Sequence, residues 1–152
     1  MTCFWSAILQ TLNHQDRQLL QIGSSAREAD VVTAIKKRIT DTDTDTDTNT
    51  DTNTNINHTK SIFSSVLWQG HSFSPKFISE CYEWIKDYNI HGIYGGHLTS
   101  SCDPFLLFLC GFLGWNINFH YQRILIQIGN TNNSQPKRTV QFGGNSHHFY
   151  RI

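Results

Sequence analysis

Apolar residues recur at helical spacing through the first three quarters of the chain. In the first such segment Trp5, Ile8, Leu9 and Leu12 follow the i, i+3, i+4, i+7 pattern, which places them on one helix face. Ser74 and Asp103, each followed by proline, have the residue types that begin helices. Helices are predicted over four ranges, namely residues 3–13, about 25–39, 75–88 and 104–113.

The period of the apolar positions changes from helical to alternating after Gly114. Alternation predicts strands around 117–121, 124–128 and 140–142, with turns at 130–137 and 143–145 and a last strand in His147-His148-Phe149-Tyr150. Helices followed by neighbouring strands predict an α+β fold, in which N-terminal helices pack on a small C-terminal antiparallel sheet.

Residues 40–59 form a tract of alternating Thr, Asp and Asn. Both alternating positions are polar, so a strand made of them would have no face to bury. The tract is therefore predicted to be a disordered insertion that interrupts one domain spanning residues 1–152. Its DTDTD pieces lack the glycine and the final glutamate of a calcium-binding loop, and no calcium site is predicted.

Composition argues against several partners. Lys plus Arg and Asp plus Glu both number 12, so the chain lacks the basic surface expected for nucleic acid or anionic lipid. The longest apolar run, residues 105–115, is about half the length needed to cross a membrane. The N-terminus lacks the basic start of a signal peptide, and the four cysteines are irregularly spaced, so free thiols in the cytoplasm are expected.

The two ends of the chain carry the candidate chemistry. Cys3 opens the first predicted helix, where backbone N–H groups favour a thiolate and can hold an oxyanion. A histidine brought beside this thiol would act as its base. Alternation puts His147 and His148 on opposite faces of the last strand, but it does not tell which face meets the helix.

Three segments resemble a known family. Cys3-Phe4-Trp5-Ser6-Ala7-Ile8-Leu9 resembles the nucleophile helix of papain-like cysteine proteases. The order of Tyr94-Gly95-Gly96-His97, the helix from Asp103 and Trp115-Asn116-Ile117-Asn118-Phe119 is similar to that of the OTU (ovarian tumour) deubiquitinases. His148-Phe149-Tyr150 resembles that family's final histidine-aromatic strand.

The resemblance implies a papain-like, OTU-like cysteine protease fold without a cofactor or metal. It implies cleavage after the C-terminal glycine of ubiquitin or a ubiquitin-like protein, with Cys3 as nucleophile and His148 as general base. Some viral members of the class resemble Cys–His dyads. If this protein were viral, the expected location would be the host cytoplasm.

Two departures from the family pattern leave a second function open. Only Met1-Thr2 precede Cys3, where OTU enzymes have Asp-Gly-x-Cys, and Tyr150 stands where the family often has Asp or Asn. A catalytically degenerate OTU-like protein that binds ubiquitin without cutting it is therefore the alternative.

Two further alternatives come from the residues themselves. Candidate zinc ligands gather within thirty residues, at His91, His97, Cys102, Cys110 and His120. They lack the paired cysteine spacing of structural zinc sites, so no metal site is predicted. The other alternative is a structural or interaction protein without a site. The sequence predicts no oligomeric state.

Overall fold

A computed structural model describes residues 3–45, 62–89, 103–131, 138–145 and 148–152. The helices are α1 (Cys3–Thr11), α2 (His14–Leu20), α3 (Glu28–Asp45), α5 (Pro75–Asp87) and α6 (Pro104–Leu113), with a helical turn at 62–64. The strands are β1 (Val66–Trp68), β2 (Trp115–Tyr121), β3 (Ile124–Asn130), β4 (Arg138–Gly144) and β5 (Phe149–Arg151). The predicted α+β class is confirmed.

Helix ends follow the capping residues in the sequence. Asp103 caps α6 by accepting bonds from two backbone N–H groups, and Gly114 ends it with a positive φ of 73°. The sequence prediction missed α2, which is seven residues long and begins with a capping box between Asn13 and Asp16. Helix α3 ends at Asp45, so the first six residues of the Thr/Asp/Asn tract extend this helix.

The five strands form one sheet in the order β1-β3-β2-β4-β5. Strands β2 and β4 are parallel neighbours, whereas the other pairs are antiparallel. The predicted antiparallel sheet is therefore wrong, and the sheet is mixed. The reason lies at the strand starts: Trp115 of β2 and Arg138 of β4 both bond the carboxylate of Asp16, which brings the two starts together.

Strand β1 was also missing from the sequence prediction. It has three residues, too few for alternation to be recognised, and it pairs with the end of β3 from Val66 opposite Asn130. Its neighbour Gln69 extends this edge, since its side-chain oxygen accepts a bond from the Gln127 N–H at 2.8 Å.

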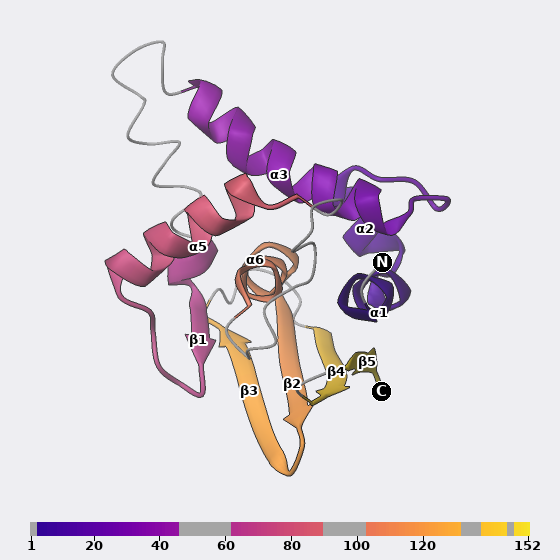
Figure 1. The fold of residues 1–152 in the computed structure, drawn as a ribbon, viewed down its shortest axis with the longest axis vertical. Coiled ribbons are helices and arrows are strands. Elements are labelled where there is room, and N and C mark those ends of the chain that lie inside the picture. Colours follow the sequence, from indigo (N-terminus) through magenta and orange to yellow (C-terminus); the bar gives the residue numbers. More distant parts are fainter. Residues whose placement is uncertain (1–2, 46–61, 90–102, 132–137, 146–147) are drawn as a thin grey trace.

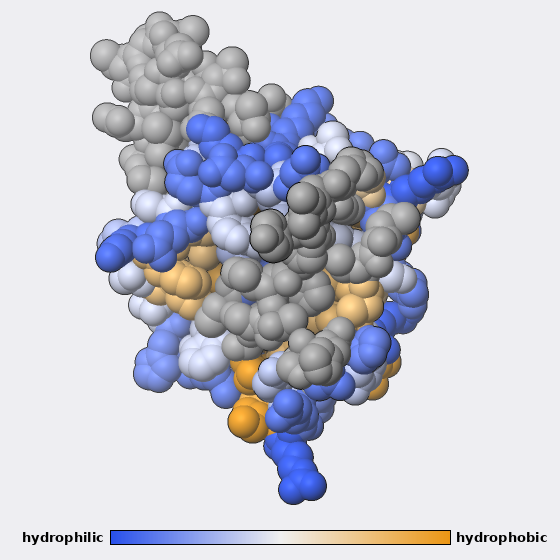
Figure 2. Space-filling model, viewed as in Figure 1, coloured by the Kyte–Doolittle hydropathy of each residue, from blue (hydrophilic) through white to orange (hydrophobic). Residues whose placement is uncertain are grey.

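The core lies between the helices and one face of the sheet (Figure 1). Helix α6 packs on β1, β2 and β3, and α1 packs on β5. Trp115, Ile117 and Phe142 are fully buried beneath them. Figure 2 shows a largely polar surface on the viewed side, with an apolar patch over the β2–β3 hairpin, where Ile124 is 61% exposed. Within the described residues, no helix is long and apolar enough to cross a membrane.

Candidate functional site

Helix α1 holds Cys3 at its first residue, and the side chains behind it fix the helix in the core. The Phe4 and Trp5 side chains are fully buried. The Phe4 ring packs against Phe149 of β5, and the Trp5 ring packs against Phe105 of α6. The Trp5 indole N–H donates to the Tyr88 hydroxyl at 3.0 Å. Cys3 itself is half-buried and is not in a disulfide.

The two ends of the chain meet at Cys3. The backbone N–H of Phe149 donates a hydrogen bond to Cys3 Sγ at 3.2 Å. This contact joins the first residue of α1 to the first residue of β5, 146 positions apart. The thiol thus lies at a helix N-terminus, against the backbone of the residue that follows His148.

His148 sits in a tight turn immediately before β5. Its backbone N–H donates to Asn145 Oδ1 at 2.9 Å, and its carbonyl accepts from the Asn145 N–H at 2.9 Å. The Phe149 side chain is buried in the core, so alternation directs the His148 side chain to the opposite, exposed face. The Cys3 thiol and the His148 imidazole, both within the described part of the chain, are not hydrogen-bonded to each other. His147 lies outside the described residues.

Tyr150 of β5 packs against the sheet. A Cβ at Gly143, its partner across β4 and β5, would lie 2.5 Å from the Tyr150 ring. The phenol ring therefore covers the backbone of β4. Tyr150 is 51% exposed and lies on the outer face of the sheet, two residues after His148 in the sequence.

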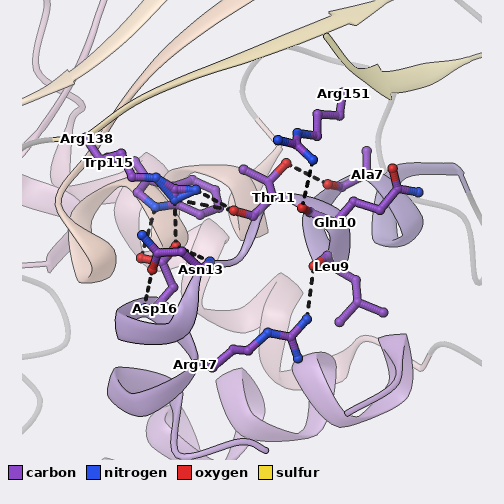
Figure 3. A network of polar contacts seen from close by, with 10 residues as sticks. All are labelled: Ala7, Leu9, Gln10, Thr11, Asn13, Asp16, Arg17, Trp115, Arg138 and Arg151. Atoms are coloured by element: carbon purple, nitrogen blue, oxygen red, sulfur yellow. Dashed lines mark hydrogen bonds and ion pairs between the residues drawn. The ribbon is translucent and has the colours of Figure 1, made fainter. Parts of the chain in front are cut away.

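Three arginines surround the other end of α1 (Figure 3). Arg17 donates to the Leu9 carbonyl at 3.3 Å, and Arg151 donates to the Gln10 carbonyl at 3.2 Å. Arg138 donates through both terminal nitrogens to the Thr11 carbonyl. The last three carbonyls of α1 are thus each bonded by an arginine from a different element.

Asp16 holds Arg138 in this position. Its Oδ2 atom pairs with Arg138 Nη1 at 2.9 Å, and its Oδ1 atom accepts from the Trp115 indole at 3.3 Å. The Arg138 guanidinium lies 5.6 Å from the centre of the Trp115 ring. Asp16 is buried, so its charge is balanced by this one salt bridge and by hydrogen bonds.

Comparisons with known proteins identify no relative. No protein-family model matches the chain, and neither the curated proteins nor the solved structures contain a significant match.

The candidate zinc ligands do not gather in the described part of the chain. Cys110 is buried in α6 and its thiol points to the Trp115 carbonyl at 3.1 Å. His120 is exposed on β2 and bonds the Gln141 side chain at 3.0 Å. His91, His97 and Cys102 lie outside the described residues. Within those residues, no group of three His, Cys, Asp or Glu side chains could hold a metal ion.

The structure also has a groove, of about 470 Å³, beside α3 and the loop before it. Leu20, Ile22 and Ala34 give it apolar walls, and Lys37 is among its polar residues. None of its lining residues is a cysteine or a histidine.

Sequence reasoning missed the residues that hold the candidate site together. The Phe149 N–H is a backbone group, which leaves no mark in the sequence. Asp16 and Arg138 lie far apart in the chain. The one local signal was Asn13-x-x-Asp16, a polar pair with capping-box spacing just after the first predicted helix.

Proposed function

We propose that the chain is a cysteine-type peptidase of papain-like, OTU-like fold, in which Cys3 is the nucleophile and His148 is the general base. The observation that carries the proposal is the 3.2 Å hydrogen bond from the Phe149 N–H to Cys3 Sγ. It brings the residue after the histidine to a thiol at the first residue of a nine-residue helix. Helix N-termini and N–H donors both favour negative charge on sulfur.

The proposed reaction follows the usual course of thiol hydrolysis. His148 takes the proton of Cys3, and the thiolate attacks the substrate carbonyl to form a C–S bond. The C–N bond then breaks, and the protonated imidazole gives its proton to the leaving amine. Water, deprotonated by the same imidazole, hydrolyses the thioester and restores the thiol. Backbone N–H groups in the first turn of α1 can stabilise the intermediate oxyanion.

In this proposal the His148 side chain moves from the outer face to the thiol, which requires a change in its backbone angles because the backbone sets the direction of the side chain. The residue is exposed and lies just before β5, outside the strand pairing, so the backbone contacts that would have to open are the two with Asn145. Substrate binding at the N-terminal end of α1 would favour the inward conformation. Catalytic hydrogen bonds of this kind often tighten only when substrate is bound.

The substrate in this proposal is the C-terminal glycine of ubiquitin or a ubiquitin-like protein, in the cytoplasm of the cell or of a viral host. The support is the resemblance of the segments at Cys3, Gly95-Gly96 and His148 to the OTU family.

An electrophilic ubiquitin probe, carrying a C-terminal vinyl sulfone, tests the proposal. The wild-type protein should form a covalent adduct at Cys3, and Cys3→Ala should form none. Cys81→Ala is the matched control because Cys81 is buried in α5 and away from the N-terminus of α1. His148→Ala should slow labelling by about 100-fold or more, whereas His120→Ala should leave it unchanged. A wild-type protein that stays unlabelled contradicts catalysis by Cys3.

The second candidate is a ubiquitin-binding protein that does not cut. Two observations favour it: the thiol and the imidazole are not hydrogen-bonded, and Tyr150 packs on Gly143 where a polar third residue would orient the histidine. Calorimetric titration with ubiquitin separates the two functions. Binding by a protein that the electrophilic probe does not label would establish the non-catalytic function.

A further inference from the structure

The contacts at the two ends of α1 suggest how Cys3 is kept in place. At the N-terminal end the helix meets β5 through Cys3 Sγ and the Phe149 N–H. At the C-terminal end it meets β5 again, through the Gln10 carbonyl and the Arg151 guanidinium. The helix is therefore tied to the same three-residue strand at both ends, and that strand directly follows His148.

The remaining ties come from β4 and α2. Arg138, the first residue of β4, binds the Thr11 carbonyl and the Asp16 carboxylate together. Arg17 of α2 binds the Leu9 carbonyl and, through its other nitrogen, the Gly23 carbonyl at 3.0 Å. Figure 3 shows these side chains converging on the end of α1 from separate elements.

This arrangement is more than general helix capping. The last carbonyls of a helix lack intrahelical partners and carry its negative pole, so one cation near them is common. Here each of the last three carbonyls has its own guanidinium. Fixed bonds to three successive carbonyls resist both sliding of α1 along its axis and rotation about it. Either movement would carry Cys3, about 10 Å away along the helix, off the Phe149 N–H.

We propose that Arg17, Arg138 and Arg151 are positioning residues, which set the reactivity of Cys3 by holding α1 in register with β5. The proposal rests on Cys3 being the nucleophile of the proposed function. Arg138 has the largest role, because the buried Asp16 and the Trp115 ring fix its guanidinium. Arg151 is exposed and makes one such bond, so its role is smaller.

The test measures the rate at which iodoacetamide alkylates Cys3 in the folded protein, by mass spectrometry of the Cys3 peptide. Arg138→Met should slow alkylation by about threefold to tenfold, because a shift of α1 takes Cys3 Sγ off the Phe149 N–H and one hydrogen bond to sulfur is lost. Arg151→Met should slow it by about threefold. Arg138→Lys and Arg151→Lys keep a donor for the same carbonyl and should restore a large part of the rate. Arg123→Met, in the exposed β2–β3 turn, is the control and should change nothing.

Each possible result either supports or overturns the positioning role of the arginines. Rates that stay unchanged or rise in the methionine variants, or that the lysine variants fail to restore, overturn the inference. The Arg151 pair remains decisive if Arg138→Met does not fold, because the Arg151 side chain is exposed. A wild-type Cys3 that reacts no faster than glutathione contradicts the proposed function as well. A wild-type Cys3 that reacts fast, with a rate that no substitution of Arg138 or Arg151 changes, overturns the positioning role alone.

Discussion

At the scale of single residues, glycines mark where backbones approach too closely for a side chain. A Cβ added at Gly111 of α6 would overlap the backbone carbonyl of Ile62 and lie 2.8 Å from its Cγ2 atom. The three atoms nearest to a Cβ at Gly143 all belong to the Tyr150 phenol, which is half-exposed and can swing away. The two positions therefore differ in what has to move.

We expect Gly111→Ala to lower the free energy of unfolding by about 1–3 kcal/mol, since the rigid backbone at Ile62 has to shift. This loss would occur although alanine favours the helix by about 1 kcal/mol. Gly143→Ala should cost less than about 1 kcal/mol. Urea denaturation checks both values. Gly23→Ala is the control, because its Cβ would meet nothing within 4 Å. Equal losses at Gly111 and Gly143 would contradict this account.

At the residue scale, the sequence predicted the start of the first helix but not the direction of the His148 side chain. The position of Cys3 follows from an apolar helix pattern that begins at residue 3, and the structure begins α1 there. Alternation could not tell which face of the last strand is buried. That choice is made by Phe149, whose ring packs on Phe4, Phe119 and Phe142, contacts between distant segments that periodicity does not contain.

At the scale of elements, two helices begin with the same device in different surroundings. Ser74 and Asp103 are both N-caps followed by proline. Ser74 is exposed and accepts one bond, from the Phe77 N–H at 3.2 Å. Asp103 is buried and accepts two, from the Phe105 N–H at 2.9 Å and the Leu106 N–H at 3.3 Å.

Removing the two caps should therefore have unequal effects. Ser74→Ala should cost about 1 kcal/mol, the usual value of an exposed cap. Asp103→Ala should cost about 2–4 kcal/mol, because it leaves two buried N–H groups without their acceptor. Asp103→Asn keeps an acceptor oxygen and should recover part of the loss. Chemical denaturation of the four proteins measures the difference, and an Asp103→Ala loss no larger than that of Ser74→Ala would refute it.

Elements with strong end signals were predicted well, and weakly marked ones were missed. Asp103, Pro104 and Gly114 define α6 in the sequence, and the structure gives the predicted range. Helix α2 and strand β1 are too short for a period to be recognised. Their positions depend on partners elsewhere in the chain. Asp16 of α2 bonds Trp115 and Arg138, and β1 pairs with β3.

At the scale of the whole molecule, sheet topology was beyond the reach of sequence patterns. Three alternating segments in a row are compatible with a meander, which the sequence predicted. In the structure β4 lies on the far side of β2 from β3 and runs parallel to β2. The deciding contacts join Asp16 to Trp115 and Arg138, over 99 and 122 positions. Arg138 also bonds the Thr11 carbonyl, so the network that joins β2 to β4 also holds the C-terminal end of α1, the helix that begins with Cys3.

Tyr88 links the helices to one another and is expected to make global stability depend on pH. Its hydroxyl accepts from Trp5 of α1, its carbonyl accepts from Lys36 of α3, and its ring packs on Phe105 of α6 at 4.9 Å. Burial raises the pKa of Tyr88 above its ordinary value of 10.0, the Trp5 hydrogen bond partly lowers it, and the Asp103 charge raises it further.

The raised pKa fixes the sign of a pH effect on unfolding. Between pH 10 and the higher folded pKa, the unfolded tyrosine loses its proton while the folded one keeps it, so stability falls as pH rises. Below pH 10 both states are protonated, and this contribution is fully present. Tyr88→Phe removes this pH-dependent contribution together with the hydrogen bond from Trp5. The stability gap between wild type and Tyr88→Phe should therefore narrow between about pH 8 and about pH 11, as measured by urea denaturation. Phe108→Leu is the control: it removes no titrating group, so the difference in stability between this variant and wild type should not change with pH. If the difference for Tyr88→Phe also stays constant, Tyr88 does not couple folding to pH.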